Sequence, residues 1–555
     1  MFKMNLSSLK KSRITTIIIC LIVISSISVG FKLSHVDFTT PLINEDVYVY
    51  VLGAFSIVNG DFSQPDRKTL GWSIFISPFY LFIDSTDLLD YLNITRILSI
   101  AISTVTIIPM YILARRFFDE KYSLIASCLL AFEPHLNYNS GGGLAEPLLI
   151  LVLILSMNFI LSDKTKYHYI AFIFTGFCWW VRLEAIYPVI AIIFIYFIAH
   201  RTKSNYLRKF FLCMIFLLII ISPLFVQRYL QFDDPFYVWY SGTILSDDYA
   251  ELLTTENKGI TDFVEKHGIL GLMDRLATGL MNLFNILIRI SFPYLFILIP
   301  LGILFSLRPV DQKLKNIKAN WIMIIAIISI IMIPFAIIDE RRWIFPIFPF
   351  LIILSTIPIQ RITNYGLSTF SFNEKQKSIF LVTAVSIILL LSCTFTVGIG
   401  EFGYGLPNSA LEREKIKFTE HLVENFDGRI LRDEVVNDYL AYVNLTSDDN
   451  DFKTFKSPRG KNPYPDLYEP GKVVRMSVYG KTVEELVTNG ETRELKYIAI
   501  LEKGSYFFPF LNDLYYNEEK YPYTKKIFDS NEMNYKEFKI KVFEIDYKIY
   551  HELNG

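Results

Sequence analysis

The chain has 555 residues, of which 52% are hydrophobic and 15% aromatic, and its mean hydropathy is +0.36. These values exceed those of ordinary soluble proteins and predict a protein with many membrane spans. The formal net charge of −1 argues against general nucleic-acid binding, because neutralising phosphates requires an excess of basic residues. The five cysteines all lie in hydrophobic runs, which argues against a disulfide framework.

Apolar runs long enough to cross roughly 30 Å of hydrocarbon predict about eleven transmembrane helices. They lie near residues 14–31, 94–114, 122–136, 145–161, 167–181, 183–200, 209–226, 284–307, 320–338, 343–360 and 378–399. Lys and Arg concentrate before the first span and in every second loop. The positive-inside rule therefore places the N-terminus in the cytoplasm and the region after the last span outside. The first span is interpreted as a membrane anchor rather than a cleaved signal peptide, because Ser28-Val29-Gly30 matches a cleavage site poorly.

The first long outer loop, residues 32–93, contains two adjacent acids, Glu45 and Asp46. A helix lying at the membrane interface is predicted after them, because apolar residues from Val47 to Val58 recur at helical spacing. Acids in the first turn of a helix often only complement the helix dipole. The same dipole keeps a carboxylate ionised, as a base or metal ligand requires. Both interpretations remain open from these residues alone.

A basic stretch follows in the same loop, where Arg67 and Lys68 precede a second predicted interfacial helix from about Trp72 to Phe82. Basic residues outside the cytoplasm, beside an acidic pair, indicate a bound anion such as a phosphate. The alternative is that these side chains pair with nearby acids or extend toward lipid headgroups.

The second outer loop contains His135, a glycine run at 141–143, and Glu146 at the start of the next span. The glycines allow the backbone to bend closely around another group. A glutamate at a helix start is usually structural, but one at membrane depth on the same side as Asp46 is a candidate functional residue. His135 is a candidate metal ligand, although a hydrogen-bonded interfacial histidine is the favoured interpretation.

Arginines also interrupt the apolar pattern later in the chain. Arg182 and Glu184 are two residues apart, a spacing that does not place side chains together on a helix, so we expect each to have its own partner. Arg341 and Arg342 follow the ninth predicted span on the outer side, where a double arginine requires a counter-ion such as a phosphate. The second large outer loop, 227–283, is rich in aromatic residues, which suits either sugar stacking or an interfacial belt.

The region from about residue 400 is polar and alternates between strand-like and helical segments. Strands are expected at 429–431, 497–501 and 538–545, and helices at 411–425 and 482–488, which predicts a small α/β domain. The predicted organisation is therefore a transmembrane module at 1–399 and an extracytoplasmic α/β domain at 400–555.

The whole arrangement resembles membrane glycosyltransferases of the GT-C class, in particular the protein O-mannosyltransferase, aminoarabinose transferase and RgtA-like branch. The likeness rests on the N-terminal span, Glu45-Asp46 before an interfacial helix, the basic stretch at Lys68, and Glu146 at the end of the second outer loop. It covers roughly residues 14–360 and is one of layout and short motifs. It implies a polytopic α-helical GT-C-like fold with a C-terminal soluble α/β domain, embedded in the cell membrane.

The resemblance also implies a reaction and its residues. An inverting enzyme would transfer a sugar from a polyprenyl (dolichyl-type) phosphate donor to a protein, glycan or lipid acceptor on the extracytoplasmic side. Asp46 matches the catalytic base, with Glu45 as its neighbour or substitute, and Glu146 matches the second acid. The residues implied to bind the donor phosphate are Lys68, Arg182, and Arg341 or Arg342. Thr69-Leu70 stand where relatives often have Pro-Pro, which weakens the assignment of Lys68.

The sequence does not decide whether a metal ion is required, and it leaves two functions other than glycosyl transfer as alternatives. Relatives differ in their need for a divalent metal ion, for which Asp46, Glu146 and His135 are the candidate ligands. A multispan transporter or lipid-linked sugar flippase predicts charges near mid-bilayer and pseudo-symmetric halves, whereas here the charges cluster at outer span ends. A non-catalytic sugar-binding or assembly subunit predicts that Asp46→Asn leaves sugar transfer intact. The sequence does not identify the sugar, the acceptor or the oligomeric state.

Overall fold

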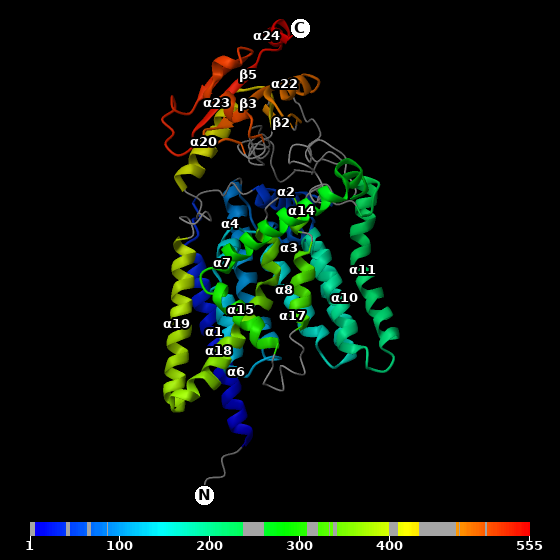
Figure 1. The fold of residues 1–555 in the computed structure, drawn as a ribbon, viewed down its shortest axis with the longest axis vertical. Coiled ribbons are helices and arrows are strands. Elements are labelled where there is room, and N and C mark those ends of the chain that lie inside the picture. The colour runs from blue at the N-terminus through cyan, green and yellow to red at the C-terminus, as the bar shows by residue number, and fades with distance from the viewer. Residues whose placement is uncertain are drawn as a thin grey trace.

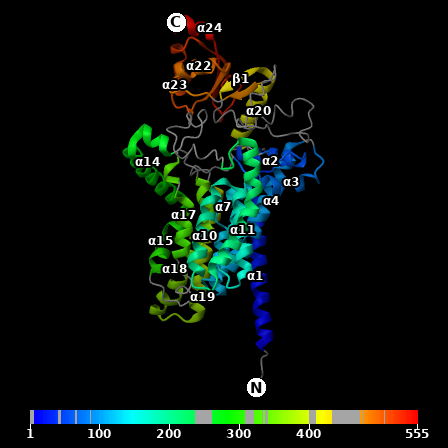
Figure 2. The same cartoon turned by 90° about the vertical axis from the view of Figure 1, so that its right-hand side faces the viewer.

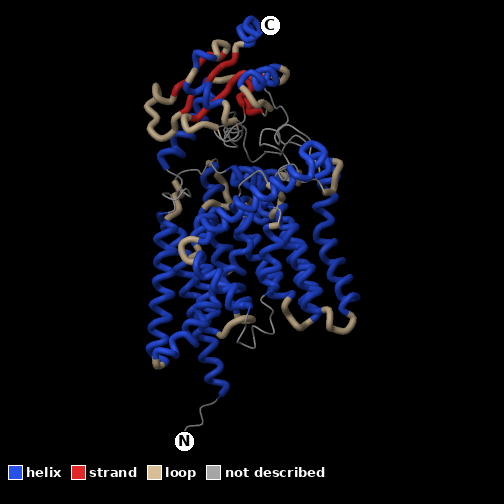
Figure 3. The backbone as a smooth tube through the Cα atoms, in the orientation of Figure 1, coloured by secondary structure: helices blue, strands red, loops and turns tan. Residues whose placement is uncertain are grey.

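Helices make up most of the chain, and a small β-sheet domain lies at one end of the helical body, opposite the N-terminus (Figure 1, Figure 3). The turned view in Figure 2 shows the same arrangement. The structure is a computed structural model. It describes residues 6–39, 45–63, 68–85, 87–236, 260–307, 320–331, 333–336, 341–398, 409–431, 473–476, 478–505 and 508–554.

Within the described residues, the helical body consists of α-helices with loops and short 3₁₀ and π segments between them. In chain order the helices are α1 (Leu6–Ser34), α2 (Glu45–Val58), α3 (Gly71–Tyr80), α4 (Leu88–Val105), α5 (Ile107–Ala114), α6 (Glu120–Ala131), α7 (Pro134–Gly141), α8 (Glu146–Ile160), α9 (Thr165–Val181), α10 (Ile186–His200), α11 (Tyr206–Phe232), α14 (Ile260–Ser291), α15 (Leu295–Leu307), α17 (Asn320–Ile330), α18 (Phe348–Arg361) and α19 (Glu374–Gly398). The 3₁₀ segments include η1 (Leu183–Ala185), η2 (Ile333–Phe335) and η3 (Arg341–Ile347).

Within the described residues, six helices are long and apolar enough to cross a membrane, and a seventh span results if one bent pair is counted. The bent pair comprises 263–291 and 295–306, with an angle of 108° between its halves. Within the described residues, two other predicted spans, at 145–161 and 320–338, correspond to apolar helices shorter than the usual membrane-crossing length. The prediction of an integral membrane protein is confirmed, whereas the count of eleven spans stays a prediction.

The core of the helical body forms around α18, whose residues 348–360 are all buried. Its two neighbours α15 and α6 pack along it, which is why this segment can be apolar on every face. By contrast, α19 exposes large apolar side chains such as Ile379, Val382 and Leu390. Apolar exposure on an outer helix is expected where lipid replaces water as the solvent.

Two arginines of the predicted cytoplasmic loops bind the C-terminal carbonyls of helices. Arg116 donates to Leu161 O at 2.8 Å after the end of α8, and Arg361 donates to Phe305 O at 2.9 Å in α15. The last carbonyls of a helix have no partner within the helix and carry a partial negative charge. These basic residues therefore close helix ends in addition to any role in membrane orientation.

The predicted C-terminal α/β fold is confirmed. Its elements are α20 (Ser409–Asn425), β1 (Gly428–Leu431), β2 (Val473–Met476), α22 (Val483–Glu491), β3 (Leu495–Leu501), α23 (Leu511–Tyr516), β4 (Thr524–Asp529), β5 (Ile540–Ile545) and α24 (Tyr547–Asn554). The strand order is β2-β1-β3-β5-β4. β1 runs parallel to β2 and β3, and β5 runs antiparallel to β3 and β4.

The two faces of this sheet bury different helices. Along β3, Ile498 and Ile500 join a cluster with α22 and α23, whereas Tyr497 and Ala499 join a cluster with α20. This alternation follows from the two-residue period of a strand. The N-terminal half of α20 is also tied to the sheet domain, because the Glu414 carboxylate accepts hydrogen bonds from the backbone N–H groups of 536–538 at 2.8–2.9 Å.

Candidate active site

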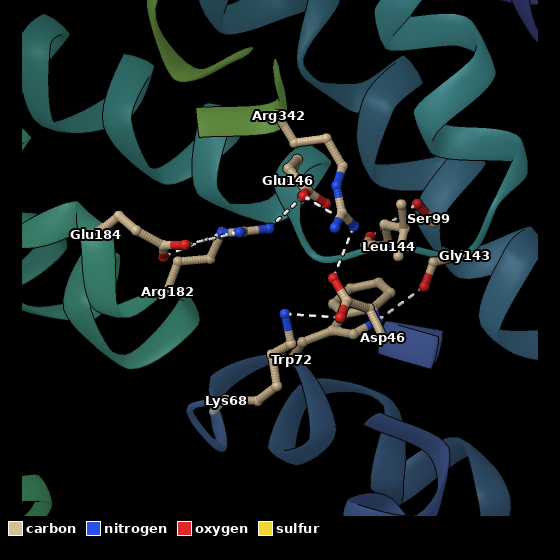
Figure 4. A network of polar contacts seen from close by, with 10 residues as sticks. All are labelled: Asp46, Lys68, Trp72, Ser99, Gly143, Leu144, Glu146, Arg182, Glu184 and Arg342. Carbon is tan, nitrogen blue, oxygen red and sulfur yellow. Dashed lines mark hydrogen bonds and ion pairs between the residues drawn. The ribbon is translucent and has the colours of Figure 1, made fainter. Parts of the chain in front are cut away.

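Five charged side chains predicted from the sequence converge in one place (Figure 4). One of the helices that carry them, α2, lies at the end of the helical body nearest the sheet domain (Figure 1). The five side chains come from five different segments. Asp46 lies in the first turn of α2, Lys68 in the loop before α3, and Glu146 at the first residue of α8. Arg182 follows the last residue of α9, and Arg342 lies in η3. The fold thus joins residues that are far apart in sequence.

Asp46 is held between two cations. Lys68 Nζ lies 2.8 Å from Asp46 Oδ1, and Arg342 Nη1 lies 2.7 Å from Asp46 Oδ2. The same Arg342 Nη1 lies 3.8 Å from Glu146 Oε1, so one guanidinium spans the two predicted catalytic acids. Figure 4 shows Arg342 reaching between them.

Arg182 connects Glu146 to a third carboxylate. Its Nη1 pairs with Glu146 Oε1, and its Nη2 lies 2.9 Å from Glu184 Oε1. The expectation that Arg182 and Glu184 have separate partners is therefore wrong. That expectation assumed a helix, but Arg182 is extended, with φ −149° and ψ 142°, at the break between α9 and η1. Because Arg182 and Glu184 (in η1) do not belong to one continuous helix, the helical spacing rule does not apply to this pair.

Among the residues that the structure describes, these ion pairs join equal numbers of cations and carboxylates. The resulting network contains three cations, Lys68, Arg182 and Arg342, and three carboxylates, Asp46, Glu146 and Glu184. The Glu146 side chain is 0% exposed and that of Arg182 5% exposed, whereas the Asp46 side chain is 13% exposed. Asp46 is thus more accessible than Glu146, the other predicted catalytic acid whose side chain the structure describes.

The two cations determine the ionisation of Asp46. Burial alone would raise the pKa of the Asp46 carboxyl, but the neighbouring charges of Lys68 and Arg342 outweigh burial and hold that pKa well below its usual range. Asp46 is therefore an anion at neutral pH. As long as both cations contact it, its affinity for a proton is low.

Two other predicted residues lie apart from these ion pairs. His135 is buried in α7 among the rings of Phe345, Phe348 and Phe395. Arg341 interacts electrostatically with His135, and the ion pairs with Asp46 and Glu146 are made by its neighbour Arg342. The Glu45 side chain lies outside the described residues.

Of the candidate metal ligands, Asp46 and Glu146 both lie near Arg342, whereas His135 lies among phenylalanine rings. Among the residues that the structure describes, no group of three or more His, Cys, Asp or Glu side chains is arranged to hold a metal ion. A divalent ion between Asp46 and Glu146 would have to replace Arg342, which occupies that position. Metal dependence stays an open prediction.

The structure adds residues that the sequence did not single out as part of the site. Tyr50 lies one helical turn after Asp46, is 1% exposed, and interacts electrostatically with Asp46, Glu146 and Arg182. The i, i+4 spacing from Asp46 was its only sequence signal. Trp72 and Ser99 contact the backbone just before Glu146, and no residue pattern indicates such contacts.

Comparisons with known proteins agree with this fold. The family model for dolichyl-phosphate-mannose-protein mannosyltransferase matches residues 90–226. The chain is similar to the oligosaccharyltransferase of Archaeoglobus fulgidus solved with Zn and sulfate, with a TM-score of 0.54 and 13% identity over 87% of this chain and 68% of that chain. No curated protein matches the sequence.

Two further solved structures are similar. The archaeal oligosaccharyltransferase AglB from Archaeoglobus fulgidus, in complex with an inhibitory peptide and a dolichol-phosphate, has a TM-score of 0.51 and 11% identity, covering 87% of this chain and 69% of that chain. ArnT from Cupriavidus metallidurans bound to undecaprenyl phosphate has a TM-score of 0.49 and 11% identity, covering 94% and 97%. The family match and the fold shared with the oligosaccharyltransferase confirm the resemblance to GT-C class membrane glycosyltransferases.

Proposed function

We propose that this protein is an inverting glycosyltransferase that moves a sugar from a polyprenyl phosphate donor to a protein, glycan or lipid acceptor. The observation that carries the proposal is the Asp46 carboxylate held by Lys68 and Arg342. The GT-C fold and the description of the matching family support it.

The donor phosphate is proposed to bind Lys68 and Arg342. A phosphate has the same sign of charge as the carboxylate that these cations now contact, and it offers more acceptor oxygens. Arginine suits this exchange because its planar guanidinium binds phosphate in a bidentate manner, and lysine supplies a point charge. The cations would also stabilise the negative charge that develops on the phosphate as it leaves.

Asp46 is proposed to act as the base once the phosphate has taken its cations. Loss of these two partners removes the cause of its low pKa, so the carboxylate can accept the proton of an acceptor hydroxyl. The acceptor oxygen then forms a bond to the anomeric carbon from the face opposite the phosphate. The bond between that carbon and the phosphate oxygen breaks, its electron pair stays on the phosphate, and the configuration inverts. Glu45 remains the alternative base.

Glu146 and Arg182 are proposed to organise the cations. Glu146 is fully buried and contacts both Arg182 and Arg342, so it keeps Arg342 next to Asp46 when the donor is absent. Arg182 is proposed to reach the donor phosphate from the far side of Glu146. Arg341 remains a proposed phosphate ligand only if η3 turns toward the site.

The remaining predictions concern the membrane orientation of the chain, the number of spans and the role of the sheet domain. We propose that the N-terminus is cytoplasmic and that residues 1–399 form the catalytic module with eleven spans. The sheet domain, within 400–555, would then lie outside the cytoplasm and help to select or orient the acceptor. Its position at the same end of the helical body as Asp46 supports this role (Figure 1).

The test is transfer in vitro from a panel of labelled undecaprenyl-phosphate and dolichyl-phosphate sugars. Wild type is expected to transfer from at least one donor, and Asp46→Asn and Glu146→Gln are expected to lose transfer. Glu120→Gln is the matched control, because Glu120 pairs with Arg115 at 4.0 Å outside this network. Full activity in both site variants would reject the proposed site, and no transfer from any donor would favour a transporter.

A further inference from the structure

The backbone just before Glu146 is held by side chains from two other helices. Trp72 of α3 donates its indole N–H to Gly143 O at 3.1 Å, and Ser99 of α4 donates its hydroxyl to Leu144 O at 3.1 Å. Both donors are buried, with Trp72 and Ser99 each 0% exposed. Figure 4 shows the two contacts beside the ion pairs of Asp46 and Glu146.

The backbone conformation of Gly143 determines where the two carbonyls point. Its φ of +72° lies in the left-handed region that favours glycine. The turn presents two consecutive carbonyls to two different helices, α3 and α4. A buried carbonyl without a donor is costly, so loss of either side chain would favour a different path for the backbone that leads into α8.

The segment that carries Trp72 also contacts the other charged parts of the site. Lys68, four residues earlier, pairs with Asp46. Gly71 packs directly on the end of α9, because a Cβ at this position would lie 2.3 Å from Trp180 O, two residues before Arg182. Residues 68–72 therefore contact the segments of Asp46, Glu146 and Arg182.

We propose that Trp72, with Ser99 as a second donor, is a positioning residue that sets the place of the Glu146 carboxylate relative to Asp46. This inference rests on the proposed function. Trp72 is not a catalytic residue, because its indole N–H binds the Gly143 carbonyl rather than a reacting group. Carboxylates and cations that act together must be held within a fraction of an ångström, and a buried hydrogen bond to the preceding backbone supplies that restraint.

Packing is the alternative role for Trp72, since its ring stacks on Phe75 with centroids 5.5 Å apart. Trp72→Phe separates the two roles, because it retains an aromatic ring and removes the N–H donor. Ser99→Ala removes the second donor. Ser156→Ala is the matched control: it removes a buried hydrogen bond between α8 and α9, from Ser156 Oγ to Ala171 O at 3.0 Å, that lies well along α8 from Glu146.

The first measurement is hydrogen exchange of the full-length protein in nanodiscs. Trp72→Phe and Ser99→Ala are expected to speed exchange of the backbone amides at 141–146, whereas Ser156→Ala leaves these amides as in the wild type. Unchanged exchange in Trp72→Phe would overturn the inference, whether or not a donor sugar has been found.

The second measurement is the rate of transfer from a donor that the panel identifies. Trp72→Phe is expected to lower kcat by about 10- to 100-fold, the size expected for a misplacement near 1 Å. Its affinity for undecaprenyl phosphate should stay at the wild-type value, because Lys68 and Arg342 are intact. Glu146→Asp displaces the same carboxylate, so the effects of Trp72→Phe and Glu146→Asp should not add. Additive effects, or a wild-type kcat in Trp72→Phe, would overturn the inference.

The two proposals fail in different ways. If Asp46→Asn and Glu146→Gln transfer sugar normally, or no donor is used, the proposed function fails and the exchange experiment still decides whether Trp72 holds the turn. If those two variants lose transfer while Trp72→Phe retains a wild-type rate, only the positioning role is rejected.

Discussion

Among the charged residues of the site, Arg182 is predicted to cause the largest loss of folding stability when it is replaced. Its side chain is 5% exposed and pairs with Glu146, which is 0% exposed, and with Glu184, which is 18% exposed. In Arg182→Met, Glu146 would retain only Arg342 at 3.8 Å. Removing one partner of a buried ion pair typically costs about 3–5 kcal/mol, because the other charge stays buried. We expect a loss of stability of that size.

The measurement is thermal unfolding of the purified protein in detergent. Adding Glu146→Gln to Arg182→Met should restore part of the lost stability, because the fully buried side chain is then neutral and the carboxylate left without Arg182 is that of Glu184, which is 18% exposed. Transfer should stay abolished. Arg116→Met is the matched control, since Arg116 binds the neutral carbonyl of Leu161 rather than a buried acid, and it should cost less. Equal stability of Arg182→Met and wild type, or no rescue by Glu146→Gln, would refute the ion-pair argument.

Two further predictions concern packing and pH. Gly71→Ala would place a Cβ against Trp180 O, so transfer and thermal stability should fall, with a cost of about 1–3 kcal/mol. Gly30→Ala, where nothing lies within 4 Å of the new Cβ, should retain both. Burial tends to raise the pKa of Glu414, but the three backbone N–H groups of 536–538 lower it below its ordinary 4.5 overall. Glu414 therefore stabilises this attachment above pH 4.5 and loses the effect as the pH falls further. The measurement is the protection factor of the amides at 536–538, which corrects for the intrinsic pH dependence of exchange. Protection that does not fall at low pH and is unchanged in Glu414→Ala would contradict this.

Much of the site was predictable because charge is costly in an apolar chain. Asp46, Lys68 and Glu146 stood out as ionisable residues beside membrane spans, and the positive-inside pattern assigned them to one side. The structure brings all three into one network. Sequence alone left Arg341 and Arg342 equivalent, and only the path of η3 shows that Arg342 makes the ion pairs.

Other features depend on tertiary structure that a residue pattern does not encode. The contact between Arg182 and Glu184 was missed because a helical spacing was assumed where the chain is extended. Trp72 and Ser99 bind main-chain carbonyls 71 and 45 residues away, and a carbonyl has no sequence signature. The strands at 429–431 and 497–501 were visible as apolar runs, but their parallel pairing was not.

The most direct test of the proposed mechanism is Asp46→Asn, measured for both ligand binding and transfer in the same nanodisc preparation. The amide no longer competes for Lys68 and Arg342, so undecaprenyl phosphate should bind at least as tightly as to wild type. Transfer from the donor that wild type uses should fall by about 10²- to 10⁴-fold, the contribution of a general base. Transfer at the wild-type rate, or loss of undecaprenyl phosphate binding, would contradict the proposal that Asp46 exchanges its cations with the donor phosphate and then acts as the base.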